Sequence, residues 1–207
     1  EMCIRDSIGT DSDRALLLDF QATLEIKPEK AIKLEKDALA QIENITADNA
    51  RLVSNLHANL GGLYRMNGHP DLAREHMEKS ISLLDQFNLL HINDSIPQIA
   101  NYAMFLTEQQ EPERGISELQ KLSGIIKEYH SDDCLDYAKV QETLGTIYLM
   151  TANLPQAKTH FKRAFKIYEK IWADEPEMIE AKYQEIQELY PQIGFCIGKN
   201  LSGLLTK

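Results

Sequence analysis

The side chains that could carry out acid–base or metal chemistry are scattered along this chain. Among its six histidines, His69 and His76 are seven residues apart and follow His57, but no HExxH or comparable ligand spacing occurs. Glu175 and Glu177 stand at an expected helix start, where carboxylates interact favourably with the helix dipole. The glycine patterns of nucleotide-binding loops and hydrolase nucleophiles are also missing. We therefore predict no catalytic residue, no metal site and no cofactor, and a protein that is not an enzyme.

The composition indicates a folded, acidic protein. Apolar residues make up 43% of the 207 residues and charged residues 26%, which is ordinary for a globular chain. The formal net charge of -10 argues against nucleic acid and against an anionic membrane surface. No apolar run approaches the roughly 18 residues of a transmembrane helix, and three widely spaced cysteines allow no disulfide framework. We expect a cytoplasmic protein that contacts neither nucleic acid nor membrane directly.

A 42-residue repeat organises most of the chain. Leu60-Gly61 recurs as Tyr102-Ala103 and again as Leu144-Gly145, each time 42 residues later. The same period relates Ala73, Gly115 and Ala157; Met77, Leu119 and Phe161; and Pro28, Pro70 and Pro112. A fixed period in this range is typical of stacked supersecondary units. Such stacks mostly work by presenting an extended binding surface.

Each repeat is predicted to be two helices with a break between them. Apolar side chains fall at helical spacing over residues 52–64, Asn67-Gly68-His69-Pro70 then interrupts the helix, and a second apolar face follows over residues 72–84. Small residues at Gly61, Ala103 and Gly145 are predicted to let the first helix approach the second closely. A larger side chain there typically costs ~1–3 kcal/mol.

The order Leu-Gly-x2-Tyr followed by Ala-x3-Phe-x2-Ala resembles the tetratricopeptide repeat. The match is clearest at Leu144, Gly145, Tyr148, Ala157, Phe161 and Ala164. The minimal repeat of that family has 34 residues, and the 42-residue period is similar to its kinesin-light-chain-like variant. The resemblance covers about residues 12–190. It implies an all-α, right-handed superhelical solenoid of antiparallel helix pairs.

This resemblance suggests a division of the chain. Residues 1–11 match no repeat and are expected to be an unassigned or foreign edge, residues 12–190 to hold four repeats plus the first helix of a fifth, and residues 191–207 to form a degenerate C-terminal helix. The stretch from Ile193 to Leu205 is apolar, whereas a solenoid cap has a polar outer face. It is expected either to mediate self-association or partner binding or to fold back onto the fourth repeat. We expect the chain to be a fragment of a longer protein.

The resemblance also implies a concave groove lined by the first helix of each repeat. The positions predicted to contact a peptide there are Asn55, Asn59, Arg65, Asn101, Met104, Lys139 and Glu142. Asn59 and Asn101 are 42 residues apart, and an Asn side chain can both donate to and accept from an extended main chain. The alternative is that both are merely solvated, since Thr143 occupies the next equivalent position. Basic residues are few, mainly Arg65 and Lys139, which disfavours the carboxylate clamp of chaperone-binding members of the family.

Three methionines, Met66, Met104 and Met150, occupy related positions near the loops. They are expected either to fill packing gaps or to form an adaptable ligand surface.

We predict a non-enzymatic scaffold that binds a protein or an extended peptide segment through main-chain hydrogen bonds and pockets between adjacent first helices. The alternative is a sensory or regulatory repeat module of a larger signalling protein, either a peptide-responsive transcription regulator or an NTPase. A helix-turn-helix or P-loop domain upstream would distinguish these.

Overall fold

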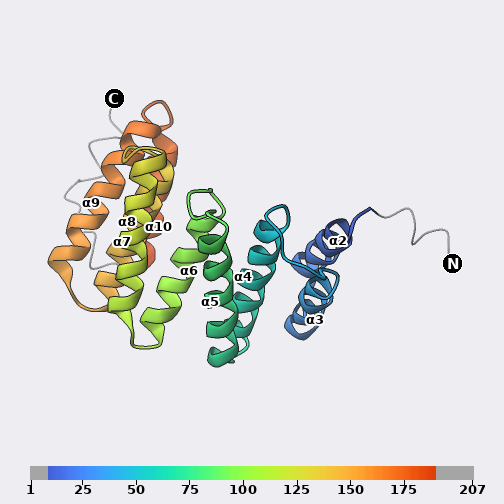
Figure 1. Cartoon of the computed structure of the whole chain (residues 1–207). Coiled ribbons are helices and arrows are strands. Elements are labelled where there is room, and N and C mark those ends of the chain that lie inside the picture. The colour runs from blue at the N-terminus through green and yellow to red at the C-terminus, as the bar shows by residue number, and fades with distance from the viewer. Residues whose placement is uncertain (1–8, 190–207) are drawn as a thin grey trace. The chain divides into compact units, whose positions relative to one another are not determined.

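The computed structural model describes residues 9–189, and within this range every regular element is a helix (Figure 1). The chain divides into two units, Glu1–Phe105 and Leu106–Lys207. The first contains α2 (Asp11–Leu24), α3 (Pro28–Leu39), α4 (Ala50–Met66), α5 (Pro70–Gln86) and most of α6 (Ser95–Glu108). The second continues with α7 (Pro112–Tyr129), α8 (Leu135–Met150), α9 (Leu154–Ile171) and α10 (Pro176–Leu189).

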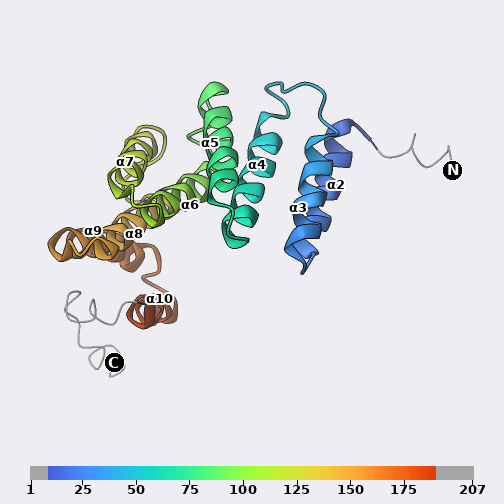
Figure 2. The same cartoon turned by 90° about the horizontal axis from the view of Figure 1, so that it is seen from below.

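Within each unit, helices that follow one another pack side by side. In the first unit α2 lies beside α3 and α4 beside α5, and in the second unit α8 lies beside α9, as both views show (Figures 1 and 2). The apolar segment from Ile193 to Leu205, for which we predict either self-association or packing on the fourth repeat, lies outside the described residues.

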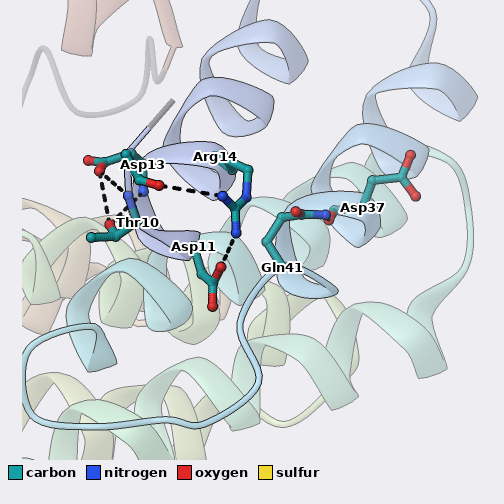
Figure 3. Close-up of polar contacts among 7 residues, drawn as sticks. Thr10, Asp11, Asp13, Arg14, Asp37 and Gln41 are labelled. Carbon is teal, nitrogen blue, oxygen red and sulfur yellow. Dashed lines mark hydrogen bonds and ion pairs between the residues drawn. The ribbon is translucent and has the colours of Figure 1, made fainter. Parts of the chain in front are cut away.

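The helices begin where the sequence supplies N-terminal signals. Proline is the first residue of α3, α5 and α7 and the second of α9, where its missing N–H would have had no helical partner. Before α2, Thr10 and Asp13 form a capping box: the Asp13 N–H donates to Thr10 Oγ1, and the Thr10 N–H donates to Asp13 Oδ2 at 2.7 Å (Figure 3). The Thr10 N–H and the Thr10 hydroxyl both donate to Asp13 Oδ2, and these two bonds lower the pKa of the exposed Asp13 carboxyl.

The first helices of three successive repeats end in the same way. Gly68, Gln110 and Ala152, which follow α4, α6 and α8, have φ of 74°, 65° and 58° and are spaced by 42 residues. Each next residue donates its N–H back to the last turn of the helix, for example His69 N to Tyr64 O at 2.9 Å and Asn153 N to Tyr148 O at 2.7 Å. This is the Schellman arrangement, which satisfies carbonyls that the helix end leaves free.

Close approach of paired helices depends on glycine in two repeats. A Cβ on Gly61 would lie 2.6 Å from Met77 Cγ and 3.3 Å from the Ala73 carbonyl oxygen. A Cβ on Gly145 would lie 2.8 Å from the Phe161 ring. The predicted packing reason for Gly61 and Gly145 is therefore confirmed.

Most predicted core positions are buried, including Leu56, Leu60, Leu144 and Phe161. One residue of the predicted apolar face of α5, Leu72, is instead 39% exposed, whereas its neighbour Ala73 is fully buried. Among the described residues, the structure contains no helix with the length and apolarity needed to cross a membrane.

Candidate functional site

The first unit contains a groove of about 510 Å³. Most of its lining comes from α4 and α6, with one residue from α2 and two from α5. The lining residues are Asp19, Asn55, Ala58, Asn59, Gly62, Arg65, Met66, Met77, Ser80, Asp94, Pro97, Gln98 and Asn101. Amide side chains are prominent in it, and its apolar part is made of small or flexible residues.

Four of the seven sequence-predicted contact residues, Asn55, Asn59, Arg65 and Asn101, line this groove. Met104 does not belong to the lining although it follows Asn101 on α6 by one turn. The other two, Lys139 and Glu142, lie on α8 in the second unit and line or neighbour a different hollow.

A hydrogen-bonded network under the groove holds Asn55 in place. Ser54 and Ser80, both buried, lie within hydrogen-bond distance of Gln98 Oε1 at 2.9 and 2.5 Å. Gln98 Nε2 in turn donates to Asn55 Oδ1 at 2.6 Å. Because Ser54, Ser80, Gln98 and Asn55 are joined by hydrogen bonds, the groove floor is pre-organised across α4, α5 and α6.

Asn59 connects α4 to two carboxyl groups of the first repeat. Its side-chain amide donates to Asp19 Oδ1 on α2 at 2.9 Å and to Glu35 Oε1 on α3 at 3.1 Å. These bonds give Asn59 a structural role that we did not predict. Both bonds are donated by Asn59 Nδ2, so this amide nitrogen is already hydrogen-bonded within the protein before a peptide main chain arrives.

Glu35 is an unusual buried acid. The residue is only 1% exposed, and its Oε2 atom has no hydrogen-bond partner. Burial, together with the neighbouring Asp19 carboxylate, raises the pKa of Glu35 to about 8. Near neutral pH Glu35 is therefore largely protonated, and a protonated carboxyl beside Asp19 can donate to it.

The fixed charges of the groove lining are two aspartates and one arginine. Asp94 is ion-paired with Arg51, at 2.6 Å. Arg65, half-buried, has interactions of its own within the protein. The carboxylate of Asp19 makes the end of the groove nearest α2 acidic.

In the second unit, Glu142 is engaged by neighbouring helices. It accepts from the Tyr168 hydroxyl on α9 at 2.6 Å and pairs with Lys182 on α10 at 2.8 Å. Burial and this carboxylate raise the pKa of Tyr168. Glu142 therefore fastens α10 to α8 and α9. Lys139 lines a hollow of about 290 Å³ with Tyr168 of α9, with Trp172, which follows α9, and with residues of α10.

Two of the three loop-proximal methionines are on the surface. Met66 is 81% exposed and Met150 is 47% exposed, so neither fills a gap in the core. Met66 lines the groove, where a flexible thioether can adapt to a ligand.

The histidines of the first unit pair with one another. His57 Nδ1 lies 2.8 Å from His76 Nδ1, and the His76 ring stacks on Tyr64 with centroids 5.5 Å apart. Burial lowers the pKa of His57 to about 4 and also lowers the pKa of His76. Across residues 9–189 there is no group of three or more His, Cys, Asp or Glu side chains placed to hold a metal ion.

Sequence reasoning missed Asp19, Glu35 and Gln98. For the two acids a signal was present, because a step of 42 residues aligns Asp19 with Gly61 and Glu35 with Met77. The first repeat thus carries a carboxyl pair where the second carries its closest apolar contact. Gln98 has no comparable signature in the repeat.

Comparison with known proteins agrees with this architecture. Residues 95–170 match the family model of the tetratricopeptide repeat. The fold is similar to that of BtubC (BKLC) from P. vanneervenii, with a TM-score of 0.64 and 20% sequence identity. The similarity covers 76% of this chain and 62% of the BtubC chain.

It is also similar to the nearly identical tetratricopeptide-like repeats of a protein assigned as a kinesin light chain from Podosopora anserina. Here the TM-score is 0.68 and the identity 13%, over 82% of each chain. No curated protein matches the sequence. The predicted all-helical, tetratricopeptide-type solenoid fold is confirmed. Such repeats serve in general as non-enzymatic scaffolds for protein–protein interaction.

Proposed function

Because the chain carries tetratricopeptide repeats of the kinesin-light-chain-like kind, we propose that it is a scaffold that binds an extended peptide segment of a partner protein in the groove between α4 and α6. The observation that carries this proposal is the groove lining itself. Asn55, Asn101 and Gln98 present amide groups along one hollow, and amides suit a peptide main chain of any sequence.

The groove's shape supports an extended occupant. Gly62 lies in the middle of α4, and a Cβ added to it would meet nothing within 4 Å. A helix-interior glycine costs roughly 0.5–1 kcal/mol relative to alanine, and packing does not require it here. Its absence of a side chain leaves room in the groove for a ligand backbone.

The test blocks this space. A peptide is first selected from a random display library on the purified protein, and its affinity is then measured for Gly62→Leu. We expect Gly62→Leu to weaken binding at least about tenfold, since its side chain projects into a hollow that a ligand must occupy. Asn101→Ala, at the exposed far side of the groove, should weaken it less.

Gly124→Leu is the matched control. Gly124 is also a helix-interior glycine at which an added Cβ would meet nothing within 4 Å, but it lies on α7 in the other unit. The substitution should leave the affinity unchanged. A selected peptide that binds wild type and Gly62→Leu equally well would refute the groove as the binding site.

A further inference from the structure

We propose that Asp19, Asn59 and Glu35 form a subsite for one cationic side chain, a lysine or arginine of the bound segment. This inference rests on the proposed function, because it assigns the chemistry of one end of the same groove.

The carboxyl pair stands where the repeat elsewhere packs apolar atoms. Gly61 meets Met77 and Gly145 meets Phe161 at the closest approach of their helices. At the equivalent place in the first repeat, Asp19 faces Glu35. The helix pair does not require acids there, since the other repeats close without them. Polar groups that break a packing pattern are expected at functional sites.

In its ionised form, Glu35 lacks one hydrogen-bond partner that a ligand could supply. Asn59 donates to its Oε1 at 3.1 Å, while Oε2 is buried and unpaired. Buried polar atoms in proteins nearly always have a partner. No Lys or Arg of the described residues forms an ion pair with Asp19 or Glu35, so the donor that is missing can come from outside the chain.

The subsite is reached from the groove. Asp19 is half-buried, and both Asp19 and Asn59 belong to the groove lining. Ala58 and Met66 line the same groove on α4 and can cover the aliphatic stem of a lysine or arginine. The arriving cation would sit at Asp19 and Asn59 and face the Glu35 carboxyl behind them.

Binding of a cation at this place is coupled to loss of a proton. Glu35 is faced by Asp19 from α2 and by the neutral Asn59 from α4, and the pKa of Glu35 is raised to about 8. The shared proton satisfies the pair when the groove is empty. When a cation arrives, the proton leaves to solvent and Glu35 becomes a carboxylate, so affinity should increase as the pH rises through that range.

The experiment uses acetylated, amidated nonapeptides of Gly, Ser and Ala that carry a single central Lys, Arg, Gln or Glu. Each is titrated into the isotopically labelled chain and followed by NMR at Asn59, Gly62 and Asn101. We expect the Lys and Arg peptides to bind about fivefold to tenfold more tightly than the Gln peptide, and the Glu peptide most weakly. The advantage of Lys should be larger near pH 9 than near pH 6, because lysine itself stays charged throughout.

Asp19→Asn and Glu35→Gln should each reduce the Lys peptide to the affinity of the Gln peptide. Asp37→Asn, an exposed neutralisation on the same helix as Glu35, is the matched control and should change nothing. Equal shifts at the groove for the Lys and Gln peptides would overturn the subsite and leave the proposed function standing. No shift at the groove for any peptide would overturn both.

Discussion

Single glycines set the spacing of two helix pairs in this protein, α4 with α5 and α8 with α9. Gly61 and Gly62 are adjacent on α4 but have opposite surroundings, since a Cβ on Gly61 would collide with Met77 and one on Gly62 would meet open space. The first glycine is required by packing. Gly62 lowers the stability of the helix, and we explain its presence by the space that it leaves in the groove.

This contrast predicts opposite effects of the same substitution. Gly61→Ala should destabilise the first unit by about 1–3 kcal/mol through overpacking. Gly62→Ala should stabilise it by about 0.5–1 kcal/mol, because alanine is the better helix former. Urea unfolding of the two variants beside wild type measures both. Two changes of the same sign would contradict the packing argument.

Glu35 predicts an unusual pH dependence. Its pKa is about 8 in the folded protein and near its ordinary value of 4.5 when unfolded, so the folded state binds the extra proton. Its contribution to stability is therefore complete below about pH 4.5 and is lost as the pH rises through about 8. Unfolding free energies between about pH 5 and pH 9 should show this decline.

Glu35→Gln keeps the size of the side chain and removes the titration. It should abolish the alkaline decline, while the exposed Asp37→Asn should retain it. If wild type and Glu35→Gln show the same decline, Glu35 is ionised in the folded protein at all of these pH values.

At the scale of the helix, the same Schellman motif ends the first helix of three repeats and forms the turn to the second helix. The residue in the left-handed conformation is glycine in only one of them, and Gln110 and Ala152 adopt positive φ with a side chain present. For residues other than glycine this conformation costs about 1–2 kcal/mol.

Exchanging these residues should therefore shift stability in both directions. Ala152→Gly should stabilise the second unit by about 1 kcal/mol, and Gly68→Ala should destabilise the first by a similar amount. Thermal unfolding measured for each variant tests this. If Ala152→Gly were less stable than wild type, the positive φ of Ala152 would not be a source of strain in the folded protein.

Another helix-scale feature is the docking of α10. Lys182, Glu142 and Tyr168 join α10 to α8 and α9, and the Tyr183 ring stacks on Phe165 with centroids 4.2 Å apart. These contacts explain why Glu142, predicted to face a peptide, is occupied within the protein.

At the scale of the whole molecule, the two units should respond differently to pH. Three half-buried histidines oppose folding when they are protonated in the acidic range: His57 and His76 in the first unit and His160 in the second. Burial lowers the pKa of all three. For a histidine with a lowered pKa, stability is present above its unfolded value of 6.5 and is lost as the pH falls. Glu35 lies in the first unit and acts in the opposite direction, because burial raises its pKa to about 8.

Hydrogen exchange can resolve these responses by location. Between about pH 6.5 and pH 4, protection should fall in both α4 and α8 after correction for the intrinsic exchange rate. Between about pH 7 and pH 9, it should fall in α2, α3 and α4 but stay level in α8 and α9. If protection fell equally in both units between about pH 7 and pH 9, a group other than Glu35 would be responsible for the alkaline loss of stability.

The sequence by itself determined the helix pairs, the 42-residue period and the glycine contacts at Gly61 and Gly145. These follow from local spacing, from capping residues and from a pattern that recurs along the chain. The partners of polar side chains were decided only by the tertiary structure. Asn59 bonds carboxyls 40 and 24 residues away, and Glu142 pairs with Lys182 on another helix. Hydrogen bonds depend on which side chains the packed helices bring within about 3 Å, and a one-dimensional period carries no such information.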